Sequence, residues 1–106
     1  MGYQRHNAIV VTSWKEDLIE LAHKQASGMF PWVSELSPEA LNGYRSFFIP
    51  PDGSKEGWPE SDAADKVRAA FFEWCRSQGY EDGSNSLCVV DVSFAGDGDA
   101  AIDKEI

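Results

Sequence analysis

Apolar and polar residues alternate along this chain in a pattern that predicts several short β-strands. Residues 6–12 contain consecutive β-branched residues, a continuous apolar run that is typical of a central strand. Residues 44–49 carry an aromatic side chain on each face, which indicates an interior strand. Residues 87–94 alternate between two registers, which predicts a strand with one buried face. A turn signal over residues 50–54 predicts a short return strand over residues 55–58.

Two further segments place apolar residues three and four positions apart, which is the spacing of an amphipathic helix. Ser13 is the predicted N-cap of the first helix, and Gly28 is its predicted C-terminal boundary. The second helix is predicted to begin at Ser61 or Asp62, and it carries its apolar stripe over residues 67–75.

This order of elements, β-α-β-β-α-β, predicts an α+β domain of the ferredoxin-like type. The two helices are expected on one face of a mostly antiparallel sheet. Residues 33–36 are a candidate extra edge strand near Val33, because proline-containing strands are tolerated at sheet edges. Other strand orders with the same succession of elements stay open. We expect a single domain over residues 1–95 and an acidic, mobile C-terminal tail over residues 96–106.

Length and composition are those of a globular protein. The chain has 106 residues, of which 42% are hydrophobic and 25% charged, and this suits one domain with its own core. No apolar run approaches the ~20 residues of a membrane-spanning helix, and the N-terminus lacks the apolar core of a signal peptide. We therefore expect a cytoplasmic protein with no membrane partner. Cys75 and Cys88 lack a CxxC spacing and are expected to be reduced core residues, with a disulfide or a reactive thiol as the alternatives.

The formal net charge of −9 is concentrated towards the C-terminus, where seven acidic residues and one basic residue lie from Glu81 onward. Direct binding to nucleic acid is disfavoured, because it needs clustered Lys and Arg side chains. A basic partner protein is favoured, and a purely solubilising tail is the alternative. The candidate acidic interaction surface consists of Asp91, Asp97, Asp99 and Asp103.

The sequence carries no catalytic or metal-binding signature. The two histidines, His6 and His23, lie at no zinc-ligand spacing from a cysteine or a carboxylate. The segment from Asp97 to Asp99 is not followed by the remaining ligands of an EF-hand loop. Neither a nucleophile elbow nor a glycine-rich phosphate loop occurs. We expect no metal and no cofactor. A non-catalytic role is favoured, and an enzyme whose site is assembled from distant residues stays open as an alternative.

A set of aromatic and basic residues around the second strand is the candidate binding site. If neighbouring strands lie side by side, these residues would offer stacking and charge-assisted hydrogen bonds to an anion such as a nucleotide. The competing interpretation is that the aromatic rings pack in the core and that the strand's arginine pairs with a carboxylate. The candidate residues are Arg5, His6, Tyr44, Arg45, Lys55 and Trp58.

Residues 2–14, 42–49 and 51–61 carry a resemblance to known proteins. They read GYQRHNAIVVTSW, NGYRSFFI and PDGSKEGWPES. In these segments the chain resembles small proteins of unassigned activity that are carried by bacteriophages and prophages. The resemblance implies phage infection of a bacterial host cell as the setting, and it implies no catalytic residue.

Two functional hypotheses follow from these observations. The first is a small acidic phage accessory protein that binds a host protein without catalysis, for example a basic nucleic-acid-binding protein or a component of host defence. The alternative is a small-ligand protein that binds a nucleotide-like anion at the aromatic and basic residues. A homodimer is a further expectation, with Phe30, Trp32 and Val33 as its candidate edge.

Overall fold

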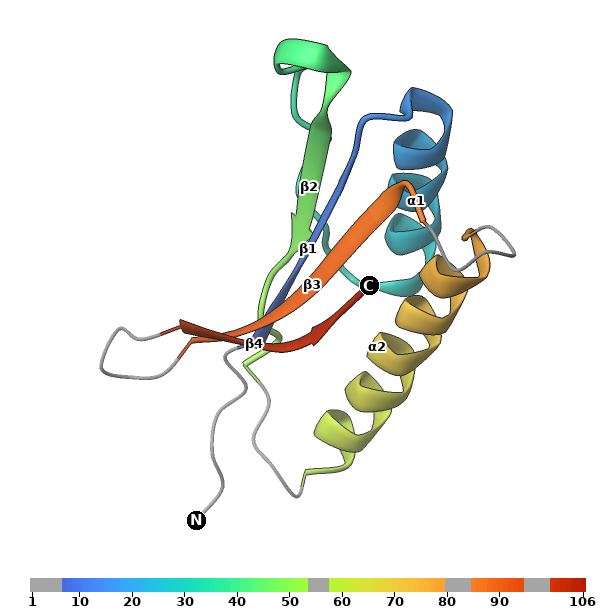
Figure 1. The fold of residues 1–106 in the computed structure, drawn as a ribbon. Coiled ribbons are helices and arrows are strands. Elements are labelled where there is room, and N and C mark those ends of the chain that lie inside the picture. Colours follow the sequence, from blue (N-terminus) through green and yellow to red (C-terminus); the bar gives the residue numbers. More distant parts are fainter. Residues whose placement is uncertain (1–6, 54–57, 80–84, 95–99) are drawn as a thin grey trace.

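The structure of the protein, a computed structural model, describes residues 7–53, 58–79, 85–94 and 100–106 (Figure 1). It contains four strands, two α-helices and one short 3₁₀ helix. In chain order these are β1 (Asn7–Ser13), α1 (Glu16–Met29), η1 (Leu41–Gly43), β2 (Arg45–Ile49), α2 (Pro59–Ser77), β3 (Leu87–Phe94) and β4 (Ala100–Glu105).

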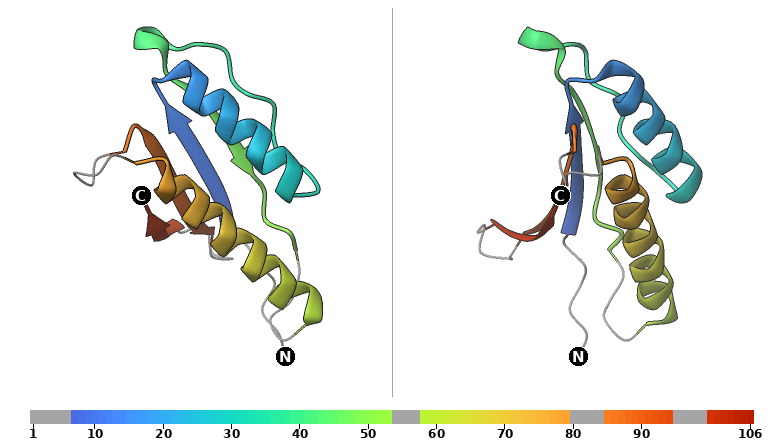
Figure 2. Two further views of the ribbon diagram at one scale, coloured as in Figure 1. Left: turned by 90° about the vertical axis from the view of Figure 1, so that its right-hand side faces the viewer. Right: turned by 45° about the vertical axis from the view of Figure 1, so that its right-hand side comes forward.

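The four strands form one sheet in the order β2-β1-β3-β4, and each neighbouring pair is antiparallel. Both helices lie on the same side of this sheet (Figure 2). The α+β class, the antiparallel sheet and the two helices on one face are therefore confirmed. The ferredoxin-like order is not confirmed, because the succession of elements in the described residues is β-α-β-α-β-β. Residues 54–57 of the expected return strand lie outside the described residues, and Trp58 directly precedes α2.

The connection between α1 and β2 explains why β2 joins β1 in the antiparallel sense. After α1, residues 30–40 run beside the place where β2 will lie, and the chain then reverses at η1. The reversal uses left-handed backbone at Asn42 (φ 67°) and Gly43 (φ 80°), residue types that adopt this conformation most readily.

The predicted edge strand near Val33 is a chain segment that caps β2 without forming a regular strand. The backbone N–H groups of Ser34 and Ser37 donate to the carbonyls of Phe48 (2.9 Å) and Ser46 (2.8 Å). The hydroxyls of the same two serines accept from the N–H groups of Phe48 (2.8 Å) and Ser46 (2.9 Å). The outer edge of β2 is thus satisfied by serine hydroxyls where a strand would use carbonyls, and further strand pairing is blocked there.

Most of the segment expected to be a mobile tail belongs to the sheet. β4 pairs with β3, and the N–H of Ile106 donates to the carbonyl of Val89 (2.9 Å). The ammonium group of Lys104 lies 5.3 Å from the centre of the Phe72 ring on α2. The domain therefore continues past residue 95 to the end of the chain, while residues 95–99 lie outside the described residues.

The hydrophobic core fills the space between the sheet and the two helices. Phe71 and Phe72 of α2 are its largest fully buried side chains. Every element except η1 and β4 contributes a fully or almost fully buried apolar residue. The core consists of Ile9, Val11, Ile19, Ala22, Ala26, Phe47, Ile49, Phe71, Phe72, Cys75, Leu87 and Val89.

The first helix begins later than its sequence predicts. Ser13 is the last residue of β1, and α1 begins at Glu16 with Lys15 as its N-cap. The fully buried Ser13 hydroxyl accepts from the N–H of Lys15 (3.0 Å) and donates to the carbonyl of Ser86 (2.7 Å). The Ser13 hydroxyl therefore links β1 to the residue before β3 and is not the N-cap of α1.

Candidate functional site

One face of the sheet is covered by α1 and α2, and no described helix or strand packs on the opposite face (Figure 2). Strand register places neighbouring side chains in rows across this face. Phe48 of β2, Val10 of β1 and Val90 of β3 form a central row. Next to it, Val92 of β3 and Ile102 of β4 lie side by side. We call this surface the open sheet face and define it by Ala8, Val10, Thr12, Ser46, Phe48, Cys88, Val90, Val92, Phe94 and Ile102.

The open sheet face is mainly apolar, and five of its ten residues are exposed, four are partly buried and Ala8 is buried. Val10 is 39% exposed, Phe48 43%, and Ile102 60%. Trp32, which is 55% exposed, packs against Phe48 with the ring centres 5.9 Å apart and extends the apolar surface past β2. The residues of β1, β2 and β3 on this face are all uncharged. The solvated face of an antiparallel sheet is normally polar, so this composition indicates an interaction surface.

The register of β3 also places apolar side chains on the open sheet face. The sequence predicts a strand with one buried face, and the structure buries Leu87 and Val89 beneath the helices. Asp91 shares that covered face. The alternate register, Cys88 to Phe94, is apolar at every position and lies on the open sheet face. The strand thus presents its more uniformly apolar side outward.

The opposite side of the molecule, formed by the two helices and their flanking turns, is acidic. On the two helices, seven exposed Asp and Glu side chains stand against three exposed Lys and Arg side chains (Lys24, Lys66 and Arg76), a difference of −4. We define the acidic helical layer as the exposed carboxylates of the two helices: Glu16, Asp17, Glu20, Glu60, Asp62, Asp65 and Glu73.

The acidic surface predicted near the C-terminus is only partly tested by the structure. The prediction is wrong for Asp91, whose side chain is 14% exposed and bonded to the Arg68 guanidinium on α2 at 2.9 Å. Asn7 donates a second hydrogen bond to the same carboxylate oxygen at 3.1 Å. Asp97 and Asp99 lie outside the described residues, and Asp103 is placed on β4 by its backbone.

The predicted aromatic and basic site is not assembled in one place. Tyr44 precedes β2 beside η1, while Trp58 precedes α2 at the other end of the molecule (Figure 1). Both rings are about half exposed, at 44% and 48%, so neither is a core residue. Arg5, His6 and Lys55 lie outside the described residues.

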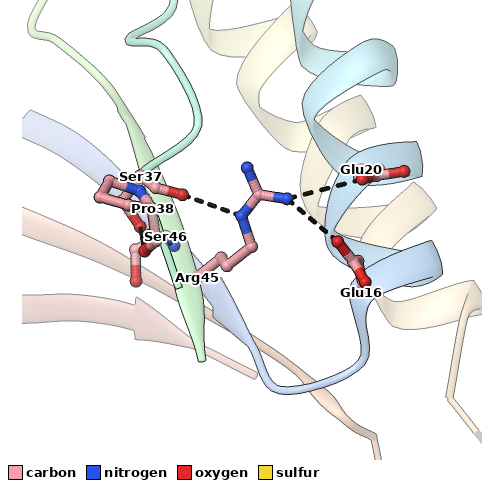
Figure 3. Close-up of polar contacts among 6 residues, drawn as sticks. All are labelled: Glu16, Glu20, Ser37, Pro38, Arg45 and Ser46. Carbon is pink, nitrogen blue, oxygen red and sulfur yellow. Dashed lines mark hydrogen bonds and ion pairs between the residues drawn. The ribbon is translucent and has the colours of Figure 1, made fainter. Parts of the chain in front are cut away.

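Arg45 is held by groups of the protein itself (Figure 3). Its Nε donates to the carbonyl of Ser37 at 2.8 Å. One terminal nitrogen lies 3.4 Å from a carboxylate oxygen of Glu16 and 3.5 Å from one of Glu20. The alternative interpretation of Arg45, a pair with a carboxylate, is the one that the structure bears out. An anion that approaches this guanidinium would lie close to the two carboxylates, which disfavours its binding there.

Replacing Arg45 with alanine is expected to lower the free energy of unfolding by about 1–2 kcal/mol, mainly because the Ser37 carbonyl loses a charge-assisted hydrogen bond. The ion pairs contribute little, since Glu16 and Glu20 are more than half exposed. Urea unfolding measures the change. Glu20→Gln is the control, with an expected loss below about 0.5 kcal/mol. A loss for Arg45→Ala no larger than that of the control would contradict this assignment.

The contacts of His23 and Cys75 indicate that both side chains stabilise the fold. His23 lies 2.8 Å from the Ser34 carbonyl through Nε2, and its ring meets Phe47 edge-on at 5.0 Å, so it ties α1 to the capped edge of β2. Cys75 is fully buried, and loss of hydration raises the pKa of its thiol to about 12, which makes it unreactive as predicted.

The core assignment is wrong for Cys88. Both cysteines are free, but Cys88 is exposed, because it follows the outward register of β3.

The described residues contain no group of three His, Cys, Asp or Glu side chains positioned to hold a metal ion. Within the same residues, no helix combines the length and apolar character needed to cross a membrane.

A pocket of about 340 Å³ lies between the end of α1, the end of β2 and the first half of α2. Its volume is in the range of small-ligand sites, and its lining is mostly apolar. Asp52 and Glu60 are among its lining residues. The cation among its described lining residues, Arg68, is bonded to Asp91. These surroundings suit an apolar or cationic group better than an anion.

The sequence singled out neither the open sheet face nor the helical layer as a site. The sequence of β3 shows two alternating sets of side chains, but this alternation does not indicate which set the helices cover. The carboxylates of the helices form ordinary polar helix faces in the sequence, and the highest density of acidic residues lies near the C-terminus. The sequence therefore does not distinguish the helical carboxylates as a binding surface. Comparison of the chain with protein-family models, with curated proteins and with solved structures found no match.

Proposed function

We propose that this protein acts without catalysis, by binding a basic partner protein through the acidic helical layer. The observation that carries the proposal is the excess of exposed carboxylates on the helix side of the molecule. The setting we propose, from the resemblance to phage proteins, is a bacterial host cell, and the partner is a host protein with a basic, nucleic-acid-binding surface.

The shape and charge of the layer suit such a partner. α2 has 19 residues and is therefore about 28 Å long, with exposed carboxylates from its first turn to its last third. α1 adds three acidic residues, Glu16, Asp17 and Glu20, within its first two turns. A surface with an excess of one charge sign steers a partner of the opposite sign and accelerates encounter. A protein surface that normally binds nucleic acid carries the complementary Lys and Arg side chains.

The test compares two triple variants that remove the same charge from different places. One carries Asp17→Asn, Asp62→Asn and Glu73→Gln in the acidic helical layer. The other carries Asp97→Asn, Asp99→Asn and Asp103→Asn near the C-terminus. Tagged protein is incubated with bacterial lysate at low salt, stoichiometric partners are identified by native mass spectrometry, and affinities for the purified partner are measured by calorimetry.

We expect the helical variant to weaken binding at least about tenfold and the C-terminal variant to change it much less, because charges that face the partner dominate the interaction. Binding should weaken as salt rises, as electrostatic association does. Circular dichroism confirms that both variants are folded. A partner without a basic surface, or equal binding by wild type and the helical variant, would contradict the proposal.

A further inference from the structure

We propose that the open sheet face is an interface with a second copy of this chain. The two sheets would pack face to face around a twofold axis, and the four helices would form the outer layers. This inference concerns the surface opposite to the acidic helical layer and does not depend on the function proposed for that layer.

The chemistry of the open sheet face fits an identical surface better than a charged partner. Its central row is Phe48, Val10 and Val90, and Val92 and Ile102 lie beside it. Glu105 is paired with Val90 on the outermost strand and contributes the carboxylate at the rim. At the other end, the hydroxyls of Ser46 and Thr12 bond to each other at 2.7 Å, so they need no partner across an interface. Apart from the Glu105 carboxylate, the patch is neutral and apolar, so it is complementary to an identical patch, as a twofold interface requires.

The net charge of −9 does not oppose this arrangement. Sheets pack about 10 Å apart, and each helical layer adds roughly another 10 Å on its side. The acidic helical layers of the two copies would therefore lie about 30 Å apart. That separation is several times the screening length of about 8 Å at physiological ionic strength, so repulsion between the layers is weak.

The size of the face is sufficient for a modest dimer. Four strands at about 4.8 Å spacing and about six residues per strand give a footprint of roughly 400 Å², before the relief of the side chains is counted. Trp32 and Phe94, which are 55% and 45% exposed, extend it at two sides. Specific interfaces typically bury about 600–1,000 Å² of accessible surface per partner, so we expect a weak, transient dimer. We expect it to form at micromolar concentrations.

The expected dimer uses a face, whereas the sequence predicted an edge formed by Phe30, Trp32 and Val33. Edge pairing beside β2 is blocked, because Ser34 and Ser37 already satisfy the backbone of Phe48 and Ser46. Trp32 remains relevant through its contact with Phe48 at the border of the open sheet face.

Sedimentation equilibrium of the full chain, over a range from below one micromolar to tens of micromolar, tests the proposal. Wild type is expected to pass from monomer to dimer. Val10→Glu and Val10→Lys should each raise the dissociation constant at least about tenfold, because either charge would be buried without a partner. Leu41→Glu is the matched control: Leu41 is 90% exposed on η1, outside the open sheet face, and its replacement should leave the dissociation constant unchanged.

Salt separates apolar burial from charge attraction. The dimer should persist at about 0.5 M salt, where charge interactions are strongly screened. Dissociation at that salt concentration would overturn the proposal. Dissociation by Val10→Glu but not by Val10→Lys would also overturn it, because the effect would then be charge repulsion rather than loss of apolar burial.

Cys88 provides a direct reporter on the same face, and it needs no substitution. Its labelling rate in wild type should fall as protein concentration rises, whereas in Val10→Glu the rate should be independent of concentration. Cys75 is buried and stays silent in the folded protein. A wild-type monomer at all concentrations overturns the proposal, whether Cys88 reacts freely or is protected by another segment of its own chain.

Discussion

Replacing Arg68 with methionine is expected to lower the free energy of unfolding by about 3–5 kcal/mol. Arg68 and Asp91 are 7% and 14% exposed at their side chains, and they bond at 2.9 Å. Without the guanidinium, the Asp91 carboxylate stays between α2 and the sheet with only the Asn7 amide as a further described donor. A buried carboxylate without its countercharge is strongly destabilising.

A double-mutant cycle distinguishes the loss of one partner from the value of the pair. Asp91→Leu should also cost about 3–5 kcal/mol, because it leaves the Arg68 guanidinium buried without a carboxylate. The double variant Arg68→Met, Asp91→Leu should recover most of the loss, since apolar residues of similar volume can replace a buried ion pair. Urea unfolding at neutral pH gives all four free energies. Additive losses in the double variant would show that the two side chains do not act as a pair.

The ion pair between Arg68 and Asp91 is also a feature that local sequence patterns do not predict. The second strand, the last predicted strand and the second helix are close to where the pattern places them, because each is specified by local periodicity. The burial of Asp91 is not local. It depends on an arginine 23 positions away, and nothing in residues 87–94 distinguishes an exposed aspartate from a paired one. Arg45 is similar, since its carboxylate partners lie on α1 and become neighbours only when the helix packs on the sheet.

Neither β4 nor the strand order could be predicted from local sequence patterns, because both depend on contacts between distant residues. Residues 100–105 contain too few apolar positions to indicate a strand, and their acidic neighbourhood is typical of a tail. The segment becomes a strand by pairing with β3, where Ile102 lies beside Val92 and Lys104 beside Asp91. With β4, the sheet has four strands among the described residues, and residues 54–57 of the predicted return strand lie outside them. Strand order therefore depended on a non-local pairing that periodicity cannot reveal.

The acidic composition and the apolar register of β3 lie on opposite faces of the domain. The acidic residues are displayed on the helix side, and the all-apolar register of β3 is displayed on the open side. Covering the apolar face with a second copy would leave two acidic layers pointing outward. A basic partner with two linked binding surfaces would then be bound with the advantage of bivalency.

Alkaline pH is expected to destabilise the protein through Cys75. The thiol is fully buried in the folded protein, and loss of hydration raises its pKa from 9.0 to about 12. Above pH 9 the unfolded chain releases a proton that the folded protein retains. The stability contributed by the neutral, buried thiol is therefore complete below pH 9. It falls by up to about 1.4 kcal/mol for each pH unit until the folded thiol ionises near pH 12.

Urea unfolding at pH 8 and pH 11 measures this loss in wild type and in Cys75→Ala. The alanine variant starts less stable, because it leaves a small cavity among the core residues. Between the two pH values, wild type should lose about 2–3 kcal/mol more than the variant, since other alkaline titrations are common to both. Cys88→Ala is the matched control: it removes an exposed thiol, and its pH dependence should follow wild type. Parallel curves for wild type and Cys75→Ala would show that the thiol ionises equally readily in the folded and unfolded chains.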